Sequence, residues 1–583
     1  MYIYKSKLNN DVFLKNTNNS MVVKYIDEIN SSCNKFRGES ISSLKFSKFR
    51  LFDETANRAL YQEDYFKRRR RMSMFLLRVW LFKEAEDIKE LEDILWAVCD
   101  EYSWALPAHL RGILTDENMI PNKVDLFAAE TTQTISEALS LCGEYLHSAV
   151  VRRCINEVFK RVIEPFETQE SEKYGLSWEN RLSNWAAVCG GAVGMAALYL
   201  IEDDERLKKI TDRAKVSCNR FFASCTDDGV CLEGISYWMY AMQYYVAFDE
   251  LLKERTGESI VVNEEKMIKL AEFPTATCLA NNISIRFSDC GGTHLYFGIL
   301  CKLHERYGVP IPQQSYYKNL IDICARNCGA VRTIAWFNPD LLHNNIKTDD
   351  VFLPNGQWAI IHYADMIVAV KGGNNAEPHN HNDIGSYMYI RGNEVIAEDL
   401  GSARYTKSYF SSDRYTFLNT GSHGHSLPIV NGGRQQYGIE YAADKFEKTD
   451  NGIRISFADA YDKKAGLKTL IRDLTLGENG AVIRDCFEFN QKTNFVTERI
   501  ITKLNAKIQD ENKVSLSKNG EKIGMIEYLS SGKIRILKDS YTMHNPSGSS
   551  DVFSSEDVQQ EVTIIEIECA TNSDKMEISY IVK

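Results

Sequence analysis

Four of the eleven histidines in this chain of 583 residues lie close together, at His379, His381, His423 and His425. The first two follow a Gly- and Asn-rich turn at residues 372–378 and are two positions apart. In an extended segment, residues two apart point to the same face, so these two imidazoles can share one site. Such a pair suits metal binding or proton transfer. The alternative is a pair of hydrogen-bonded histidines with no chemical role.

Further candidate ligands follow the histidine pair along the chain. Asp399 ends a predicted strand that starts near residue 395, and His425 lies in the segment Ser-His-Gly-His-Ser-Leu-Pro at residues 422–428. A set of two histidines and one aspartate that leaves a position for water is a usual coordination of zinc. Spacing alone does not decide which of the histidines would be ligands.

The elements that must position these residues fall into two classes. Apolar residues recur at helical spacing between about residues 55 and 330, and after about residue 350 the pattern changes to short alternating runs. No helices are interleaved with the predicted strands, which favours an antiparallel β-sandwich over a parallel sheet. We predict a multidomain α+β protein, with an N-terminal extension over residues 1–54, a helical domain over 55–340 and a β-sandwich over 350–583. Examples are predicted helices at 91–104, 124–141, 185–200 and 237–252, and predicted strands at 358–363, 366–370, 387–390 and 470–476.

Composition narrows the classes of partner. The formal net charge of -11 repels polyanions, so we expect neither nucleic acid nor an anionic membrane as a partner, and an acidic ligand would need a local basic site. No apolar run approaches the roughly 18 residues of a membrane span, and the first residues lack the features of a secretory signal. Five of the fifteen cysteines lie within apolar helical runs, which indicates buried free thiols: Cys99, Cys142, Cys189, Cys278 and Cys301. These features predict a cytoplasmic protein.

One dense basic run occurs at residues 67–71, Lys-Arg-Arg-Arg-Arg. Charge runs usually form a solvated helix face, and we expect some of these arginines to turn toward carboxylates. The second interpretation is that the run attracts an acidic sugar chain.

Several motifs together resemble one known family. In the predicted β domain, residues 379–386 (His-Asn-His-Asn-Asp-Ile-Gly-Ser), 398–401 (Glu-Asp-Leu-Gly) and 424–428 (Gly-His-Ser-Leu-Pro) resemble the β domain of heparinase II/III-type polysaccharide lyases. In the helical half, residues 184–191 and 233–238 are similar to active-site segments of that family. With residues 104–109 and 124–130, the resemblance extends from roughly residue 60 to 440.

The resemblance implies a fold and a reaction. The fold is an incomplete (α/α) toroid followed by a C-terminal antiparallel β-sandwich, with the sugar bound where the two domains meet. The reaction is β-elimination at a uronic acid of a polysaccharide or oligosaccharide, which leaves an unsaturated uronate end. Family members act on heparan sulfate, chondroitin, hyaluronan, alginate or bacterial exopolysaccharides, and the sequence does not distinguish these substrates.

The resemblance also assigns catalytic roles to three residues. Asn184 would stabilise the charge that develops on the uronate carboxylate, as an oxyanion hole does. Tyr237 would act as the general acid, and on one stereochemical course also as the base, with His379 as partner base or carboxylate contact. Alternatives remain for two of them, since Asn184 could cap a helix and Tyr237 could pack in the core. Some members of the family carry histidine where Asn184 stands here.

The remaining site residues follow from the same resemblance. His381, Asp399 and His425 would bind one structural divalent metal that supports His379, with zinc favoured by ligand type and calcium or manganese left open. His109, Trp185 and Tyr240 would line sugar subsites, or else pack in the core. Arg404, like Arg414, would pair with a substrate carboxylate or sulfate, or else form surface ion pairs. The expected partner is an acidic poly- or oligosaccharide, and a homodimer is compatible with the sequence.

Two other functions compete with the lyase. A glycoside hydrolase on a helical scaffold would need two carboxylates, for which Glu233 and the cluster at residues 202–204 are candidates. A non-catalytic carbohydrate-binding relative would be expected to lack at least one of Asn184, Tyr237 and His379. The presence of all three argues against it.

Overall fold

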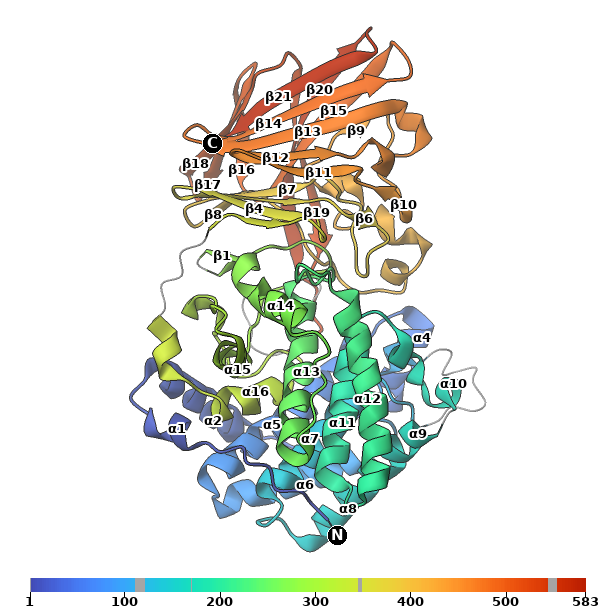
Figure 1. Ribbon diagram of the computed structural model, residues 1–583, viewed down its shortest axis with the longest axis vertical. Coiled ribbons are helices and arrows are strands. Elements are labelled where there is room, and N and C mark those ends of the chain that lie inside the picture. The colour runs from blue at the N-terminus through green and yellow to red at the C-terminus, as the bar shows by residue number, and fades with distance from the viewer. Residues whose placement is uncertain (1, 111–120, 169, 281, 344–348, 544–552) are drawn as a thin grey trace.

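The computed structural model describes residues 2–110, 121–168, 170–280, 282–343, 349–543 and 553–583. Its described α-helices precede residue 336, and its described strands follow residue 350 except for the short pair β1 (Cys278–Ala280) and β2 (Ile283–Ser284). Figure 1 shows the two halves stacked, with the helical half at the N-terminal end of the colour scale and the strands at the other. The predicted fold class, an N-terminal helical toroid followed by an antiparallel β-sandwich, is confirmed.

The helical half contains the following α-helices: α1 (Asp11–Lys15), α2 (Ser20–Arg37), α3 (Phe46–Phe49), α4 (Leu51–Thr55), α5 (Ala59–Phe82), α6 (Ala85–Cys99), α7 (Leu126–Cys142), α8 (Ser148–Val158), α9 (Glu164–Glu167), α10 (Ser171–Tyr174), α11 (Asn184–Leu200), α12 (Asp204–Ser224), α13 (Ile235–Thr256), α14 (Glu264–Thr277), α15 (Phe297–Tyr307) and α16 (Asn327–Ala335).

Helix α11 lies at the centre of this half and is apolar on all sides. It is packed against α7, α12 and α13, and its small residues permit the close approach. A Cβ atom at Gly191 would lie 2.8 Å from the Tyr244 carbonyl oxygen, and one at Gly194 would lie 2.5 Å from the Phe248 ring. A helix that is apolar all round must be enclosed by others, which agrees with the burial of nearly every α11 residue.

The basic run at residues 67–71 lies within α5 and differs from its expected solvated state. Its four arginines are all buried, and Arg68 and Arg69 share the carboxylate of Glu101, each with a contact of 2.7 Å. The other two bind glutamates of α2 and α6. The expected turn of arginines toward carboxylates is therefore observed. The prediction that this run forms a solvated helix face is wrong, because pairing with carboxylates lets α5 bury its arginine side chains against neighbouring helices.

The β half contains these strands: β3 (Val351–Leu353), β4 (Trp358–Tyr363), β5 (Met366–Lys371), β6 (Asn374–Asn375), β7 (Tyr387–Arg391), β8 (Glu394–Ala397), β9 (Ile429–Val430), β10 (Gly438–Ala442), β11 (Lys445–Thr449), β12 (Gly452–Ser456), β13 (Leu467–Gly477), β14 (Gly480–Phe489), β15 (Asn494–Thr502), β16 (Asn505–Asp510), β17 (Lys513–Lys518), β18 (Glu521–Tyr528), β19 (Lys533–Thr542), β20 (Gln559–Thr571) and β21 (Lys575–Val582).

These strands form three larger antiparallel sheets. The sheet order is β3-β4-β5-β7-β8 in the first, β11-β12-β13-β14-β21-β18-β17-β16 in the second and β19-β20-β15-β9 in the third. The five-stranded sheet lies next to the helices in Figure 1. Successive side chains of its strand β4 alternate between two cores: Trp358 and Ile360 pack in the helical core, while Ala359 and Ile361 pack in the core of the sandwich. This sheet is therefore buried on both faces and joins the two halves.

The described helices include none that is both long and apolar enough to cross a lipid bilayer. Each of the fifteen cysteines is a free thiol, and all but Cys324 and Cys486 are buried. The prediction of buried free thiols is therefore confirmed.

Candidate active site between the two domains

A cavity of about 2340 Å³ lies between the helical half and the β half. It is lined from the helical side by the ends of helices and from the other side by loops that follow the five-stranded sheet. Six of the predicted catalytic and substrate-binding residues line this one cavity: His109, Asn184, Trp185, Tyr237, Tyr240 and His379. Residues that are up to 270 positions apart in the sequence (379 minus 109) thus meet at one site.

Three helices begin at the cavity. The first residues of α7 and α11 line it, and so does the first turn of α13. Each helix N-terminus carries partial positive charge and unpaired backbone N–H groups, which favours anions. Helix α13 starts directly after Gly234, whose φ of 90° is a conformation that residues other than glycine rarely adopt. A Cβ atom at this position would also lie only 2.9 Å from the Phe287 carbonyl oxygen. This turn brings Tyr237 to the cavity wall.

Asn184 is the first residue of α11 and is completely buried. Its backbone N–H donates to Glu233 at 2.7 Å, and its side-chain amide donates to the other Glu233 oxygen at 2.5 Å. The N-cap position of α11 is held by Ser183, and the Asn184 side chain binds Glu233 instead, so the helix-cap alternative does not describe Asn184. Burial raises the pKa of Glu233, although the neighbouring His379 and Asn184 oppose the shift. Glu233 therefore orients the Asn184 amide by accepting hydrogen bonds on both of its oxygens.

Tyr237 links the helical half to the β half. Its hydroxyl lies 2.6 Å from the Tyr405 hydroxyl, and its ring stacks on His379 with 4.2 Å between centroids and 22° between planes. The side chain is half-buried and lines the cavity, so it is more than a core residue. Burial and the negative charge of Asp289 raise the pKa of Tyr237. At neutral pH the side chain is a phenol, which can donate a proton.

His379 is held in an unusual backbone conformation. Its φ of 57° lies in the left-handed region that non-glycine residues rarely adopt, a feature that clusters at functional sites. Nδ1 is hydrogen-bonded to an Asp289 oxygen at 2.8 Å, and Nε2 lies 3.6 Å from a Glu233 oxygen. Since Asp289 occupies one ring nitrogen, the other is directed toward the pair of Glu233 and Asn184.

Asp289 is a functional residue that the sequence analysis missed. It lies on a loop of the helical half, is buried, and is bound by His379, His381, Arg414 and Tyr409 of the β half. Burial opposes its ionisation, but these hydrogen bonds and the Arg414 charge hold the pKa of Asp289 well below its ordinary value. Asp289 precedes its histidine partners by ninety positions, so no local spacing could have identified it. Arg414, which was predicted to contact substrate or to form an ion pair, forms an ion pair with Asp289 at 2.8 Å.

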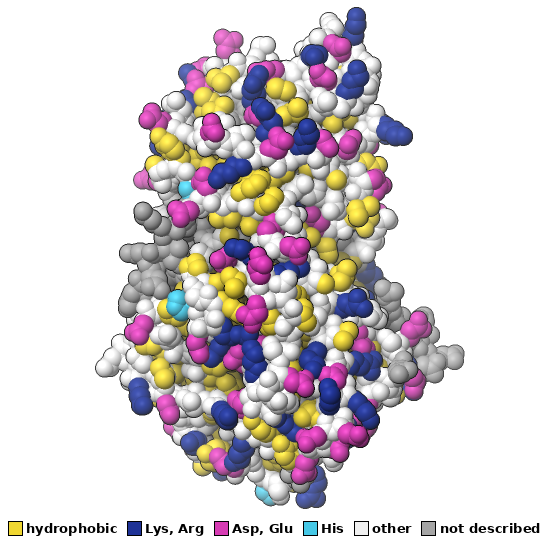
Figure 2. Space-filling view, in the orientation of Figure 1, with side chains coloured by type: hydrophobic (Ala, Val, Ile, Leu, Met, Phe, Trp, Pro, Cys, Tyr) yellow, Lys and Arg dark blue, Asp and Glu magenta, His cyan; other side chains and the backbone are white. Residues whose placement is uncertain are grey.

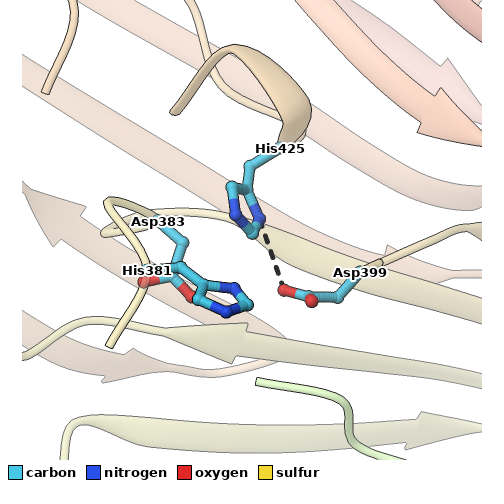
Figure 3. A group of neighbouring side chains, drawn as sticks. All are labelled: His381, Asp383, Asp399 and His425. Atoms are coloured by element: carbon cyan, nitrogen blue, oxygen red, sulfur yellow. Dashed lines mark ion pairs between the residues drawn. The ribbon is translucent and has the colours of Figure 1, made fainter. Parts of the chain in front are cut away.

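A candidate metal centre lies beside His379. His381, Asp383, Asp399 and His425 are buried and offer ligand atoms that all lie within 4.8 Å of one another (Figure 3). Three of these residues were predicted, and Asp383 was missed although it lies only two positions from His381.

The donor atoms of this cluster fit a cation. Nδ1 of both histidines and Oδ2 of both aspartates are buried without a hydrogen-bond partner in the described structure. Unpaired buried polar atoms are costly, and a bound cation would satisfy all four. Burial lowers the pKa of His381, which favours the neutral imidazole that ligates metals. The second Asp383 oxygen accepts a hydrogen bond from buried Lys371 at 2.6 Å.

The predicted substrate-binding residues have different surroundings. Nδ1 of His109 lies 2.7 Å from Asp125, and the His109 ring centroid is 4.9 Å from that of Trp185. Tyr240 lies beneath a guanidinium group, that of Arg326, at 3.7 Å from its ring centroid. Arg404 instead pairs with Asp557 and is absent from the described cavity lining. The structure therefore brings the three aromatic side chains to the cavity and leaves Arg404 at the surface.

The cavity wall is rich in basic residues although the whole protein is acidic. On the face shown in Figure 2, acidic and basic side chains are interspersed over both halves. The basic residues that line the cavity are Lys24, Arg58, Arg181, Arg286, Lys318, Arg326, Lys407, Arg414, Arg434 and Lys503. Such a lining is the local basic site that an acidic ligand would need.

Comparison with known proteins finds similarity in structure. No protein-family model and no curated protein sequence matches the chain. Among solved structures, heparinase III matches over 100% of this chain and 92% of that chain, with a TM-score of 0.60 at 10% identity. A heparan sulfate lyase from Pedobacter heparinus matches over 100% and 92%, with a TM-score of 0.56 at 11% identity. The chondroitin AC lyase of Streptomyces coelicolor matches over 97% and 80%, with a TM-score of 0.54 at 8% identity.

These matches cover both halves of the chain. The protein therefore has the fold of heparinase-type polysaccharide lyases, and the resemblance inferred from its motifs is confirmed at the level of fold. The named neighbours act on acidic polysaccharides.

Proposed function

We propose that the protein is a polysaccharide or oligosaccharide lyase that cleaves uronic-acid-containing glycans by β-elimination. The observation that carries this proposal is the convergence of Asn184, Tyr237 and His379, from two halves of the chain, on one basic cavity. The shared fold supports it, because the neighbours are polysaccharide lyases. The reaction makes two demands on the site, which these residues can meet.

The first demand is stabilisation of negative charge. Removal of the C5 proton turns the uronate carboxylate into a species with a second negative charge, which needs preorganised donors. The amide nitrogen of Asn184 carries two hydrogens, and the hydrogen bond to Glu233 uses one. The other is available to the substrate carboxylate. Burial raises the pKa of Glu233, which makes this carboxyl easier to protonate than a solvated one.

The second demand is proton transfer at C5 and at the leaving glycosidic oxygen. Tyr237 is a phenol at neutral pH and can protonate the leaving oxygen. His379, oriented by Asp289, can accept the C5 proton on Nε2. On the other stereochemical course, Tyr237 would perform both transfers and His379 would contact the carboxylate. The two rings stack with 4.2 Å between their centroids, which supports the proposal that both groups act on the same sugar.

The metal centre would support these groups. We propose that His381, Asp383, Asp399 and His425 hold one divalent ion, with zinc favoured because two imidazoles and two carboxylates suit it. When bound, the ion supplies a fixed positive charge that ties together the loops behind His379. The chain's own residues perform the proton transfers.

The hydrolase alternative loses the carboxylate cluster that was proposed as the partner of Glu233. Residues 202–204 are exposed, and Asp203 accepts a hydrogen bond from the Arg206 backbone at the start of α12. None of the three lines the cavity as described. A hydrolase would require two carboxylates on either side of the scissile bond.

The test is the product formed from uronate-containing oligosaccharides. Elimination produces a new ultraviolet-absorbing double bond without uptake of oxygen from labelled water. Tyr237→Phe should lower turnover at least about a hundredfold, because general acid–base catalysis contributes roughly that much or more. Tyr437→Phe is the matched control, since this tyrosine also lines the cavity but is 59% exposed.

Two results would contradict the proposal. One is a product that carries solvent oxygen at the cleaved bond and shows no new absorbance, which means hydrolysis. The other is near-normal turnover by folded Tyr237→Phe protein.

A further inference from the structure

Arg58 differs from every other basic residue of the cavity wall. Lys24, Arg181, Lys318, Lys407 and Arg434 are exposed, so water solvates their charges. Arg286, Arg326, Arg414 and Lys503 are partly buried and pair with carboxylates. Arg58 is also partly buried, but no carboxylate among the described residues forms an ion pair with it. A buried charge without a counter-ion is costly, which indicates that a ligand supplies one.

The local structure holds the Arg58 guanidinium in place. Arg58 precedes α5, and its carbonyl oxygen accepts the hydrogen bond from the Gln62 backbone N–H at 3.1 Å. With the Gln62 amide turned so that its oxygen faces Arg58, that oxygen accepts from Nε and from Nη2, both at 2.8 Å. Gln62 is itself only 4% exposed. The two hydrogens of Nη1 and the second hydrogen of Nη2 remain available to a ligand.

The groups near Arg58 place it close to the proposed reaction centre. Burial lowers the pKa of Arg58, and the groups that oppose this shift include Tyr405 and Tyr237, the hydrogen-bonded tyrosine pair of the site. Another of these groups is the carboxylate of Asp125, which already accepts hydrogen bonds from two backbone N–H groups and lies 2.7 Å from His109. Asp125 is therefore not a free counter-ion for Arg58.

We infer that Arg58 is a specificity-determining residue that binds an anionic group of the sugar chain, a carboxylate or a sulfate ester, through its Nη1 and Nη2 hydrogens. The guanidinium fork matches either group with two parallel hydrogen bonds. Because Tyr237 handles the reacting uronate, the group bound by Arg58 belongs to that sugar or to its neighbour. The inference rests on the proposed function for its substrate class and on the unpaired charge for its position.

The test is calorimetric binding of oligosaccharides to Tyr237→Phe protein, in which turnover is removed. The probes are a sulfated chondroitin tetrasaccharide, its desulfated form and its carboxyl-reduced form. Arg58→Gln should weaken binding of the sulfated tetrasaccharide at least tenfold. If Arg58 binds a sulfate, Arg58→Gln should not weaken binding of the desulfated probe. If Arg58 binds a carboxylate, Arg58→Gln should not weaken binding of the carboxyl-reduced probe.

Two further variants separate binding from structure. Lys24→Gln removes the same charge from the same cavity at an exposed position and should weaken binding less than threefold, because water screens that charge. Arg58→Lys keeps the charge but loses the planar fork, so an intermediate affinity is expected at an unchanged melting temperature.

The inference is overturned if Arg58→Gln and Lys24→Gln weaken binding equally, or if none of the probes binds. It is also overturned if the loss is the same for the sulfated, desulfated and carboxyl-reduced forms. Binding that depends on Arg58 in a protein that makes no unsaturated product would refute the lyase and leave the anion site standing. If the protein forms the unsaturated product and neither product formation nor binding changes in Arg58→Gln, the anion site is refuted and the lyase proposal stands.

Discussion

The side chains that would do chemistry are oriented by carboxylates from the helical half. Glu233 binds the Asn184 amide, and Asp289 binds Nδ1 of His379. A functional side chain that is fixed by a buried partner loses little further freedom when substrate binds, which favours precise geometry. The two carboxylates differ in state, since burial raises the pKa of Glu233 while several donors lower that of Asp289. The surroundings of the two carboxyl groups therefore shift their pKa values in opposite directions.

The buried carboxyl of Glu130, which lies beside Arg326 and Tyr240, allows a test of a shifted pKa through the pH dependence of stability. Burial raises the pKa of Glu130 from 4.5 to about 7, although Arg326 and Tyr240 oppose the shift. The folded state then holds a proton that the unfolded state has released, so the free energy of unfolding falls as pH rises from about 4.5 to 7. We expect Glu130→Gln to reduce this fall by about 1 to 3 kcal/mol, measured by denaturant unfolding at pH 5 and pH 8. Glu440→Gln, at an exposed position, is the control. An unaltered pH profile in the Glu130 variant would argue against a raised pKa.

At the scale of elements, the candidate metal centre joins three segments of the β half. His381 and Asp383 precede β7, Asp399 follows β8, and His425 follows the next long loop (Figure 3). These segments carry little regular structure of their own. Four buried donor atoms lack a hydrogen bond, and the contact between them is the ion pair of His425 with Asp399 at 3.4 Å. A cation there would add stability in proportion to its occupancy.

Metal analysis of the purified protein tests this centre. We expect about one equivalent of divalent metal, a lower melting temperature after chelation, and loss of metal in His381→Ala. Asp383→Asn should also weaken metal binding if Asp383 is a ligand. His423→Ala is the control, because His423 lies in the same loop but outside the cluster. Active protein without metal would refute the site.

The regular elements were largely predictable from local patterns. Strand β4 has the predicted bounds, and the ends of α11 and α13 differ from the predicted ranges by no more than four residues. The predicted helix at 91–104 is displaced, since α6 covers Ala85–Cys99. Its apolar periodicity continues beyond the helix because Trp104 folds back, where Nε1 donates to the Val98 carbonyl at 2.9 Å. Periodicity alone does not separate a helical residue from a core residue that packs against the helix end.

At the scale of the whole molecule, the two halves share both a sheet and a polar junction. The five-stranded sheet buries its two faces in different cores, and Asp289 crosses the boundary to bind residues of the β half. The junction therefore fixes the relative position of Tyr237 and His379. Any change in it should affect stability and turnover together.

Asp289→Asn is the corresponding prediction. The variant leaves Arg414, whose side chain is only 11% exposed, without its carboxylate. Removal of one member of a buried ion pair typically costs about 3–5 kcal/mol, which we expect as a loss in the free energy of unfolding. Glu144→Gln breaks the exposed pair with Lys5 and should cost less than about 1 kcal/mol. Equal losses in the two variants would show that Asp289 does not hold the halves together.

The sequence by itself determined the class of each domain and most of the metal cluster. Helical and alternating periodicities are local, and His381, Asp399 and His425 lie within one short stretch that also carries the family's motifs. Only the tertiary structure identified Asp289 and Arg58, which lie on loops or helix ends far along the chain from their partners. The histidine pair was recognisable by type and spacing. The charges that orient it and face the substrate come from elsewhere in the chain, because packing, and not sequence order, decides which charges are left without a partner.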